Sequence, residues 1–295
     1  MPRYVQPMCR LYGMSAAPHR VRATFWLIEA PDSLRAQSRR DPDGTGIGYF
    51  EPDGTPRIDK RPIAAFEDRA FAREARHVES TTFVAHVRDA TTGALTPQNT
   101  HPFEQHGRLF AHNGVIEELP ALEAQLGSYR SLVGGDTDSE RFFALVTKQI
   151  DEHDGDVAAG LTAAASWVAQ TLPVFALNVI ITTPDELWAL RYPEMQGLYV
   201  LQRPRGKPRL EHQSPAQTIH VRSEDLTDHA AVVIASEPMD EDPAWRELHS
   251  GELLHVDAKL NLTSHTAIEQ PPRHPLTLAD LEPNAAAAQA AHANR

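Results

Sequence analysis

Cys9 is the only cysteine of the 295-residue chain and the side chain best suited to covalent chemistry. A lone cysteine is most often a small buried apolar residue. Because Cys9 directly follows Met8, a translation start at Met8, or removal of residues 1–8, makes it the first residue of the mature chain. Its free α-amine, with a reference pKa of about 7.7–8.0, could then act as a base for the thiol. We therefore expect residues 1–8 to be a leader or a mis-assigned start, and Cys9 to be a candidate nucleophile.

Arg88 lies in the segment VRDATTG, at the end of an apolar stretch that reads as a buried strand. A buried arginine is costly unless it is paired. It could form a structural ion pair. It could equally use its planar fork of donors to bind the carboxylate of a substrate.

The segment AHNGV at 111–115 predicts a strand that runs into an Asn-Gly turn. A tight turn would by itself explain why Asn and Gly are adjacent here. The side-chain amide of Asn113 and the backbone N–H of Gly114 could also converge as an oxyanion hole, which stabilises the tetrahedral intermediate of acyl transfer.

The segment GGDTDSE at 134–140 predicts a helix N-terminus, with a capping side chain and acidic residues near the positive end of the helix dipole. An aspartate at this place could instead hold the ammonium group of a substrate. Each of these four segments, taken alone, has an ordinary structural explanation.

In combination and in this order, the segments resemble the class II glutamine amidotransferases, which are N-terminal-nucleophile hydrolases with a four-layer αββα fold. The resemblance runs from Cys9 to about Ile150. A later segment, Ala235-Ser236-Glu237-Pro238, is similar to stand-alone members such as the ergothioneine-pathway γ-glutamyl hydrolase. The matching motifs are Met8-Cys9, Asp43-Gly44-Thr45-Gly46, Arg88-x-Ala90-Thr91-x-Gly93, Asn99-x-His101-Pro102, His112-Asn113-Gly114 and Thr137-Asp138-Ser139-Glu140.

The resemblance implies a role for each matching residue. Cys9 would attack the γ-carbonyl of a glutamine-like substrate, with its own α-amine as general base. Asn113 and Gly114 would form the oxyanion hole. The γ-glutamyl thioester would then be hydrolysed by water, or the ammonia would pass to an acceptor.

The resemblance also implies how the amino-acid head group is bound. Arg88, helped by Thr91, would hold the α-carboxylate, and Asp138 would hold the α-ammonium. Two opposite charges that read both ends of a head group provide orientation as well as affinity. The rival hypothesis is a non-catalytic amino-acid-binding or scaffold module of the same fold, which applies if residues 1–8 are retained and block the α-amine of Cys9.

Composition narrows the function classes. Lys and Arg total 28 and Asp and Glu total 40, which gives a formal net charge of −12 and argues against a general nucleic-acid binder. No apolar run approaches the roughly 20 residues of a membrane helix. One cysteine excludes an intramolecular disulfide and fits a reducing cytoplasm. We expect a cytoplasmic protein that binds neither nucleic acid nor membrane.

No cofactor or metal is expected. The run Gly44–Gly48 lacks the GK[ST] ending of a phosphate-binding loop. None of the histidines at 86, 101, 106 and 112 has the helical i, i+4 partner of an HExxH zinc site.

The periodicity of apolar residues predicts an α+β fold in which sheets pack on each other with helices outside. The sequence predicts one domain, 9–269, followed by a flexible Pro/Ala-rich tail, 270–295. No motif of a second catalytic domain is present, so we expect a free-standing γ-glutamyl amide hydrolase or a glutaminase subunit for a separate ammonia-accepting partner. The predicted strands are 9–12, 47–50, 57–62, 81–87, 109–112, 175–182, 186–191, 198–202, 219–222, 231–235 and 253–257, and the predicted helices are 30–38, 66–77, 116–126, 137–150 and 157–172.

Overall fold

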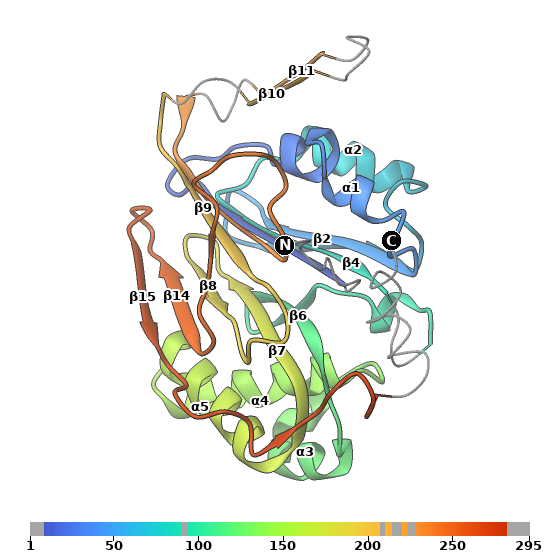
Figure 1. Ribbon diagram of the computed structural model, residues 1–295, viewed down its shortest axis with the longest axis vertical. Helices are drawn as coiled ribbons and strands as arrows, with labels where there is room; N and C mark the ends of the chain where they lie inside the picture. Colours follow the sequence, from blue (N-terminus) through green and yellow to red (C-terminus); the bar gives the residue numbers. More distant parts are fainter. Residues whose placement is uncertain (1–8, 90–93, 207–209, 214–219, 224–227, 282–295) are drawn as a thin grey trace.

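Two stacked β-sheets form the centre of the protein, and helices cover the outer face of each sheet (Figure 1). A computed structural model describes residues 9–89, 94–206, 210–213, 220–223 and 228–281. The resulting order of layers is helices, sheet, sheet, helices, which confirms the predicted α+β class and its four-layer αββα arrangement.

The first sheet has seven antiparallel strands, with β1, the strand that follows Cys9, in its middle. β1 pairs with β4 on one side and with β12 on the other. In spatial order the strands are β13 (Arg246–Glu247), β9 (Tyr199–Arg203), β12 (Ala231–Ala235), β1 (Arg10–Ser15), β4 (Thr82–Arg88), β2 (Gly44–Phe50) and β3 (Pro56–Arg61).

The second sheet is built around β6 and β7, which pair along most of their length. In spatial order its strands are β15 (Leu262–Thr266), β14 (Glu252–Val256), β8 (Leu187–Leu190), β7 (Pro173–Thr182), β6 (Arg108–Ile116) and β5 (Phe103–Gln105). The short β5 pairs with β6 only at residues 108–110, so within the described part of the chain β6 is an edge strand beyond that point.

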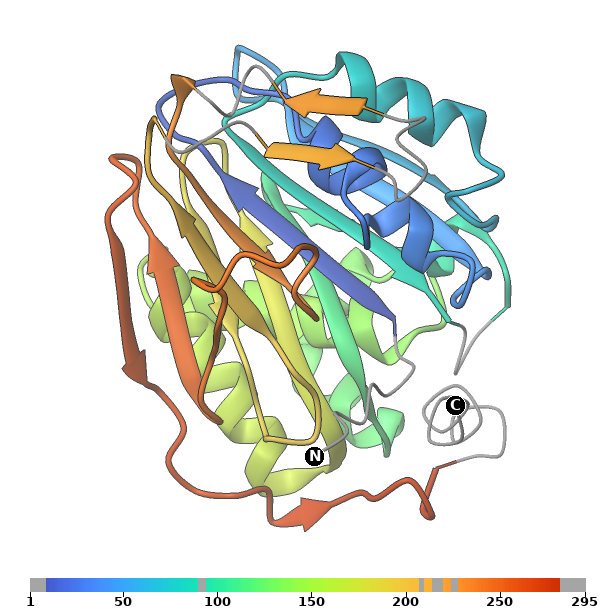
Figure 2. The same ribbon diagram turned by 45° about the horizontal axis from the view of Figure 1, so that its top comes forward.

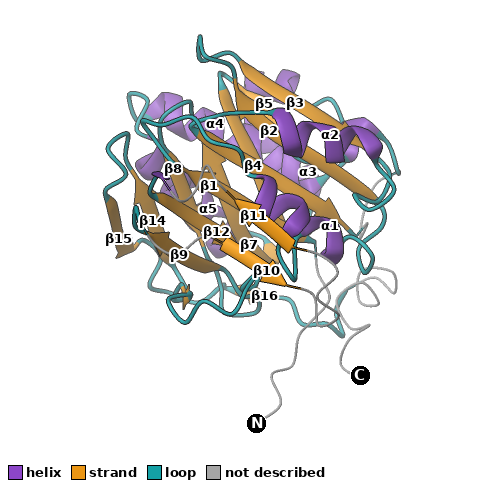
Figure 3. Ribbon diagram, turned by 90° about the horizontal axis from the view of Figure 1, so that it is seen from above, coloured by secondary structure: helices purple, strands orange, loops and turns teal. Residues whose placement is uncertain are grey.

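Helices α1 (Leu34–Gln37) and α2 (Arg69–His77) lie over the first sheet, and α3 (Leu119–Leu126), α4 (Asp138–Glu152) and α5 (Val157–Thr171) lie over the second (Figures 1 and 2). A separate two-stranded sheet, β10 (Leu210–Gln213) with β11 (His220–Ser223), lies on the same side as α1 and α2 (Figure 3). None of the helices in the described ranges is long and apolar enough to cross a membrane.

Side chains alternate between the two faces of each strand, as the period of two requires. In β1, Leu11 packs between the sheets with Val84 and Ala111, whereas Tyr12 packs toward the helices with Phe25 and other residues of the first helical layer. The same alternation places Cys9 on the face of Leu11, between the two sheets.

Capping side chains define where the longer helices begin, as the sequence predicts for the segment 134–140. Asp68 accepts hydrogen bonds from two backbone amides at the start of α2, and Thr137 and Asp156 each accept one at the starts of α4 and α5. The predicted helix at 30–38 is shorter than expected, because only Leu34–Gln37 is α-helical. A π-helical turn at Phe25–Glu29 was not predicted.

The predicted Asn-Gly turn is wrong. Asn113 and Gly114 are extended residues inside β6, opposite Asn178 and Leu177 of β7. The glycine serves a different purpose from a turn, since a Cβ at Gly114 would collide with the carbonyl oxygen of Ala176. β7 therefore approaches β6 more closely than a side chain would allow.

The predicted strand at 47–50 begins earlier than expected, because β2 starts at Gly44. A Cβ at Gly46 would collide with the carbonyl oxygen of His101. The glycines in this segment thus permit the chain around His101 to lie against the strand, and they do not mark a loop.

The first part of the segment after residue 269 lies along the second sheet. β16 (His274–Pro275) pairs in parallel with β7, and the segment passes alongside α5 (Figure 2). Leu281 is buried against Phe175. The domain boundary at 269/270 stays a prediction, and residues 282–295 lie outside the described residues.

We expect Gly160→Ala to lower the free energy of unfolding by about 1–3 kcal/mol, the usual cost of overpacking. α5 packs against α4 at Gly160, where an added Cβ would lie 2.5 Å from the backbone nitrogen of Ile150. Urea denaturation measures the change. Gln170→Ala, at an exposed position of the same helix, is the control and should shift stability by less than about 0.5 kcal/mol. A Gly160→Ala variant as stable as the parent would contradict the close helix contact.

Candidate functional site

Cys9 lies where the two sheets meet. Its Sγ is 3.2 Å from both the backbone nitrogen and the carbonyl oxygen of Asp89, which directly follows β4 of the first sheet. The side-chain amide of Asn113, in β6 of the second sheet, donates to the Cys9 carbonyl oxygen at 2.6 Å. The residue is thus fixed from both sheets.

A small cavity of about 30 Å³ opens beside Cys9, room for about two water molecules. Four of the six predicted site residues line this cavity: Cys9, Arg88, Gly114 and Asp138. Asn113 contacts the Cys9 backbone, and Thr91 lies outside the described residues. The other lining residues are His86, Asp89, Asn99, His101, His112, Thr137 and Ser139. The sequence segments that resemble one family therefore converge in space.

Arg88 is the last residue of β4 and is 4% exposed. Its Nη1 donates to the carbonyl oxygen of Ala94 at 3.2 Å. Burial lowers the pKa of its guanidinium, while the nearby carboxylates of Asp43 and Asp138 oppose that shift. An arginine remains charged throughout the physiological range even so, and the cavity therefore carries a buried positive charge at this wall.

The Gly114 amide faces the open side of β6. The Glu117 amide donates to Pro173 at the start of β7, whereas the Ile116 amide donates away from β7, to Oδ2 of Asp138 at 2.9 Å. Gly114 lies opposite Leu177, whose amide donates away from β6 to the carbonyl oxygen of Tyr192, so this is a non-hydrogen-bonded pair and the Gly114 N–H also points away from β7. β5 does not extend this far along β6, and among the described residues no strand pairs with β6 on that side at Gly114.

Asp138 is the first residue of α4 and is 6% exposed. The ring of His112 lies nearby, with Nε2 3.2 Å from the Ala176 carbonyl oxygen and Nδ1 2.9 Å from Ser139 Oγ. A carbonyl only accepts, so the ring proton belongs on Nε2, and Ser139 donates to Nδ1. Oδ1 of Asp138 is 3.4 Å from Ser139 Oγ and receives no proton from it in this arrangement.

The thiol of Cys9 is held in its neutral form. Burial raises its pKa to about 12, against the opposing effect of the hydrogen bond from the Asp89 amide. The two histidines beneath it are weak bases, since burial lowers the pKa of His86 to about 3 and that of His101 well below its usual value. Their rings lie 4.3 Å apart, and both are buried.

A cluster of buried charges behind Cys9 was missed by the sequence analysis. The Arg10 side chain is 2% exposed, and its Nε lies 3.2 Å from Glu237 and 3.7 Å from Asp41, two acidic side chains from distant parts of the sequence. Burial raises the pKa of Asp41 to about 7 and that of Asp89 to about 6, and it raises that of Glu237. The available signals were the position of Arg10 next to Cys9 and the Glu237 of the segment at 235–238.

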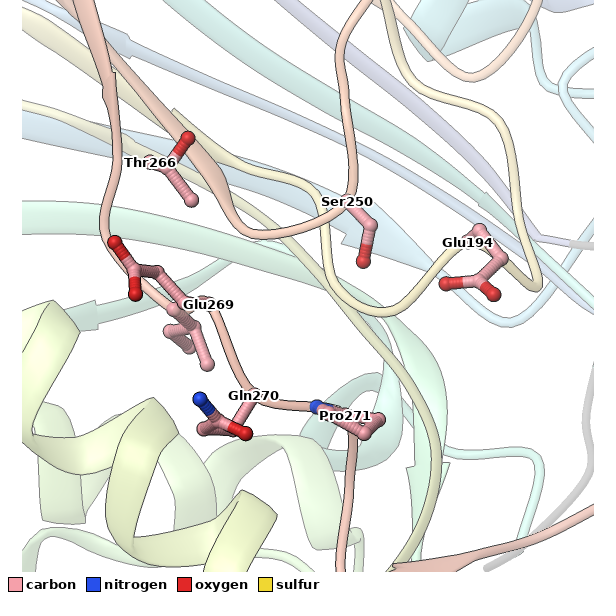
Figure 4. A pocket seen from close by; sticks show the side chains of 7 residues that line it. Glu194, Ser250, Thr266, Glu269, Gln270 and Pro271 are labelled. Carbon is pink, nitrogen blue, oxygen red and sulfur yellow. The ribbon is translucent and has the colours of Figure 1, made fainter.

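A larger depression, of about 500 Å³, lies elsewhere on the surface (Figure 4). Figure 4 shows Glu194 and Glu269 on opposite sides of it, and its wall includes no cysteine, histidine or arginine. Among the described residues, no group of three or more His, Cys, Asp or Glu side chains is arranged to hold a metal ion. The cavity at Cys9 is therefore the candidate active site.

Comparison with known proteins defines the class. Residues 8–276 match the family of class II glutamine amidotransferases, and the chain belongs to that family. It is therefore an enzyme of the amidohydrolase class that the sequence predicted. The match extends across the described fold, from the residue before Cys9 to the end of β16.

Individual relatives are distant. A γ-glutamyl-hercynylcysteine sulfoxide hydrolase of Mycolicibacterium smegmatis is 29% identical and matches 87% of this chain and 99% of its own. The protein MJ1515 of Methanocaldococcus jannaschii is also 29% identical, and the match covers 76% of this chain but only 63% of that protein.

A solved structure shows the same fold. The glutamine phosphoribosylpyrophosphate amidotransferase of Bacillus subtilis superposes with a TM-score of 0.62 at 18% identity, over 89% of this chain and 50% of that one. The similarity shows that the two proteins share the four-layer αββα fold.

We expect Asp41→Asn to stabilise the protein increasingly as pH rises. Because the pKa of Asp41 is raised from 3.8 to about 7, the stability contributed by its protonated form is fully present below about pH 4 and is lost as pH rises through about 7. Asparagine mimics the protonated form at every pH, so the gain in unfolding free energy grows over that window and then levels off.

Urea unfolding at about pH 5 and about pH 8 tests this expectation. Asp53→Asn is the exposed control: hydrogen bonds from Thr55 lower the pKa of Asp53, so its replacement should bring no gain at high pH. The same change in stability at both pH values for Asp41→Asn would show that the carboxyl is not buried as described.

Proposed function

We propose that the enzyme cleaves the γ-carboxamide C–N bond of glutamine, or of a γ-glutamyl compound, through a thioester on Cys9. The observation that carries the proposal is the single cavity that joins the Cys9 thiol to Arg88, Gly114 and Asp138. A 29% identical relative that is named for γ-glutamyl hydrolysis supports a γ-glutamyl substrate.

The thiol needs a base, because its pKa is raised to about 12. His86 and His101 border the same cavity but are poor proton acceptors at their lowered pKa values. The base in our proposal is the α-amine of Cys9 itself, freed by loss of residues 1–8. An amine with a pKa near 8 is a far better acceptor than either imidazole.

The reaction has two halves. In the first half, the α-amine accepts the thiol proton, sulfur bonds to the γ-carbon, and the C–N bond breaks as the resulting ammonium returns its proton to the leaving nitrogen. In the second half, water adds to the thioester, the C–S bond breaks, and glutamate leaves with the thiol restored. The α-amine relays one proton in each half.

The oxyanion formed in both halves would be stabilised from β6. A primary amide has two N–H groups, so Asn113 can donate to the Cys9 carbonyl and still offer a second donor to the oxyanion. The Gly114 N–H, on the open side of the strand, is the other donor. Donors fixed in a strand need no reorganisation as charge develops, and such donors are effective in a water-excluded site.

The two charged groups of the amino-acid head group would be bound by side chains of opposite charge. Arg88, with Thr91, would bind the α-carboxylate in a bidentate manner, and Oδ1 of Asp138 would accept from the α-ammonium. The ammonia product would be released or passed to a separate ammonia-accepting partner protein. A catalytic cysteine must stay reduced to act as a nucleophile. We therefore place the enzyme in the cytoplasm, a reducing compartment.

Replacing Cys9 with alanine should reduce kcat for γ-glutamyl hydrolysis by more than about a thousandfold, because no thioester can form. Released glutamate is measured on glutamine and on a panel of γ-glutamyl amides. The thermal unfolding midpoint should stay close to that of the parent, since the change removes one small atom. A loss of less than about tenfold would exclude Cys9 as the nucleophile.

The same preparations should be examined by intact mass. The active protein is expected to begin at Cys9. A retained leader in protein that releases no glutamate, but still binds it, would favour the amino-acid-binding module.

Arg88→Lys should raise KM by about tenfold or more with a smaller effect on kcat, because lysine cannot form the two parallel hydrogen bonds of a guanidinium fork. Initial rates over a range of substrate concentrations separate the two constants. Arg108→Lys is a suitable control, since Arg108 pairs with Asp151 away from the cavity. An unchanged KM in Arg88→Lys would assign Arg88 to a structural role.

A further inference from the structure

The chemistry above gives no role to Asn99, although it belongs to one of the motifs that mark the family. Asn99 ends a short 3₁₀ turn, Pro97–Asn99, and is only 1% exposed. Its side chain borders the same cavity as Cys9. A buried polar side chain at this place needs partners, and those partners are informative.

The Asn99 amide bridges two segments that are distant in sequence. Its Nδ2 donates to the carbonyl oxygen of Ala94 at 3.1 Å, and its Oδ1 accepts from the backbone nitrogen of Asp136 at 2.8 Å. The same Ala94 carbonyl also accepts from Nη1 of Arg88. On one side of the bridge lies the segment that follows Arg88, and on the other lies the turn that leads into Asp138.

We propose that Asn99 is a positioning residue that holds the carboxylate-binding and ammonium-binding sides of the pocket at a fixed separation. We call Asn99, Ala94 and Asp136 the Asn99 clasp. The inference rests on the proposed function, since it assigns the head group to Arg88 and Asp138. Asn99 itself acts through these two residues and takes no part in the chemistry at Cys9.

The residue type fits this role. The clasp needs a donor toward Ala94 and an acceptor toward Asp136 at the end of one short side chain, which is what an asparagine amide offers. Aspartate would lose the donor. It would also place a second carboxylate near that of Asp136, whose Oδ2 is 3.4 Å from the Asn99 Nδ2.

Gly135 is the steric counterpart of the clasp. A Cβ at Gly135 would lie 2.5 Å from Oδ1 of Asn99 and 3.0 Å from the carbonyl oxygen of Gln98. At Gly134, by contrast, the nearest atom to an added Cβ is 3.9 Å away. The chain thus offers two adjacent glycines of which only one touches the clasp.

A loosened clasp should weaken binding more than chemistry. The two charges of an amino-acid head group have a fixed spacing, so a variable distance between Arg88 and Asp138 reduces the time in which both are engaged. The oxyanion donors lie within the strand β6, and Cys9 is held by its contacts with Asp89 and Asn113, neither of which involves Asn99. The effect is therefore expected in KM and in the affinity for glutamate.

The experiment compares Asn99→Ala and Gly135→Ala with Gly134→Ala and Gln98→Ala, the latter at an exposed position beside the clasp. We expect Asn99→Ala and Gly135→Ala each to raise KM, and the inhibition constant of the product glutamate, by about tenfold, as expected for the loss of one or two hydrogen bonds. kcat should stay within about threefold, and the two controls should match the parent.

The double variant Asn99→Ala/Gly135→Ala provides a second readout. If both changes break the same clasp, the second adds little to the first, so the two effects on KM are not additive. Fully additive effects would overturn the proposal. So would a fall in kcat with KM and glutamate inhibition unchanged, the result expected if Asn99 only stabilises the fold.

The two proposals fail in different ways. If the parent enzyme with a verified Cys9 terminus cleaves no γ-glutamyl amide and is not inhibited by glutamate, the proposed function is wrong. If the parent cleaves a γ-glutamyl amide and Asn99→Ala leaves KM unchanged, the function stands and the Asn99 clasp is wrong.

Discussion

The hydrogen bond from the Asn113 side-chain amide to the Cys9 carbonyl oxygen joins the two sheets at the point where the candidate nucleophile lies. Each sheet is internally rigid through its own ladder, but only contacts between the layers set the position of one sheet relative to the other. Farther from the site, the sheets are held by apolar packing and, at the other end of β4, by hydrogen bonds from Thr81 and Thr82 to the backbone of Pro184 and Thr183. At Cys9 the two sheets are joined by the hydrogen bond from Asn113, so the position of the thiol is fixed relative to the hydrogen-bond donors on β6.

Two close backbone contacts near the Cys9–Asn113 hydrogen bond are possible only because the residues at these points are glycines. Gly114 admits the carbonyl oxygen of Ala176, and Gly46 admits that of His101. Each contact brings a backbone segment of the pocket wall toward a strand. Close packing of this kind is consistent with the small volume of the cavity, about 30 Å³.

The sequence predicted the architecture well and the site in part. Helix positions followed from apolar periodicity and, for α4, from the cap predicted at 134–140, because both signals are local. Cys9, Arg88, Gly114 and Asp138 were predicted together by resemblance, and the structure places them around one cavity. The roles assigned to them remain predictions, and Thr91 lies outside the described residues.

Non-local effects explain what the sequence missed. Asn113-Gly114 has the composition of a turn, yet pairing with β7 keeps both residues extended, and nothing near them in sequence announces that pairing. The cluster of Arg10, Asp41 and Glu237 joins residues about 30 and 200 positions apart, so its raised pKa values come from tertiary burial. The role of Asn99 likewise becomes visible only when its two partners are known.

The burial of Arg88 and Asp138, at 4% and 6% exposure, has a consequence for selectivity. Both groups have already given up most of their hydration in the folded protein, so neither has to be stripped of water when a ligand enters. If Arg88 and Asp138 bind the head group as proposed, a zwitterion matches both charges at once. A simple acid or a simple amine would satisfy one group and face an unscreened like charge at the other, and the wall would therefore reject molecules that carry only half of an amino acid.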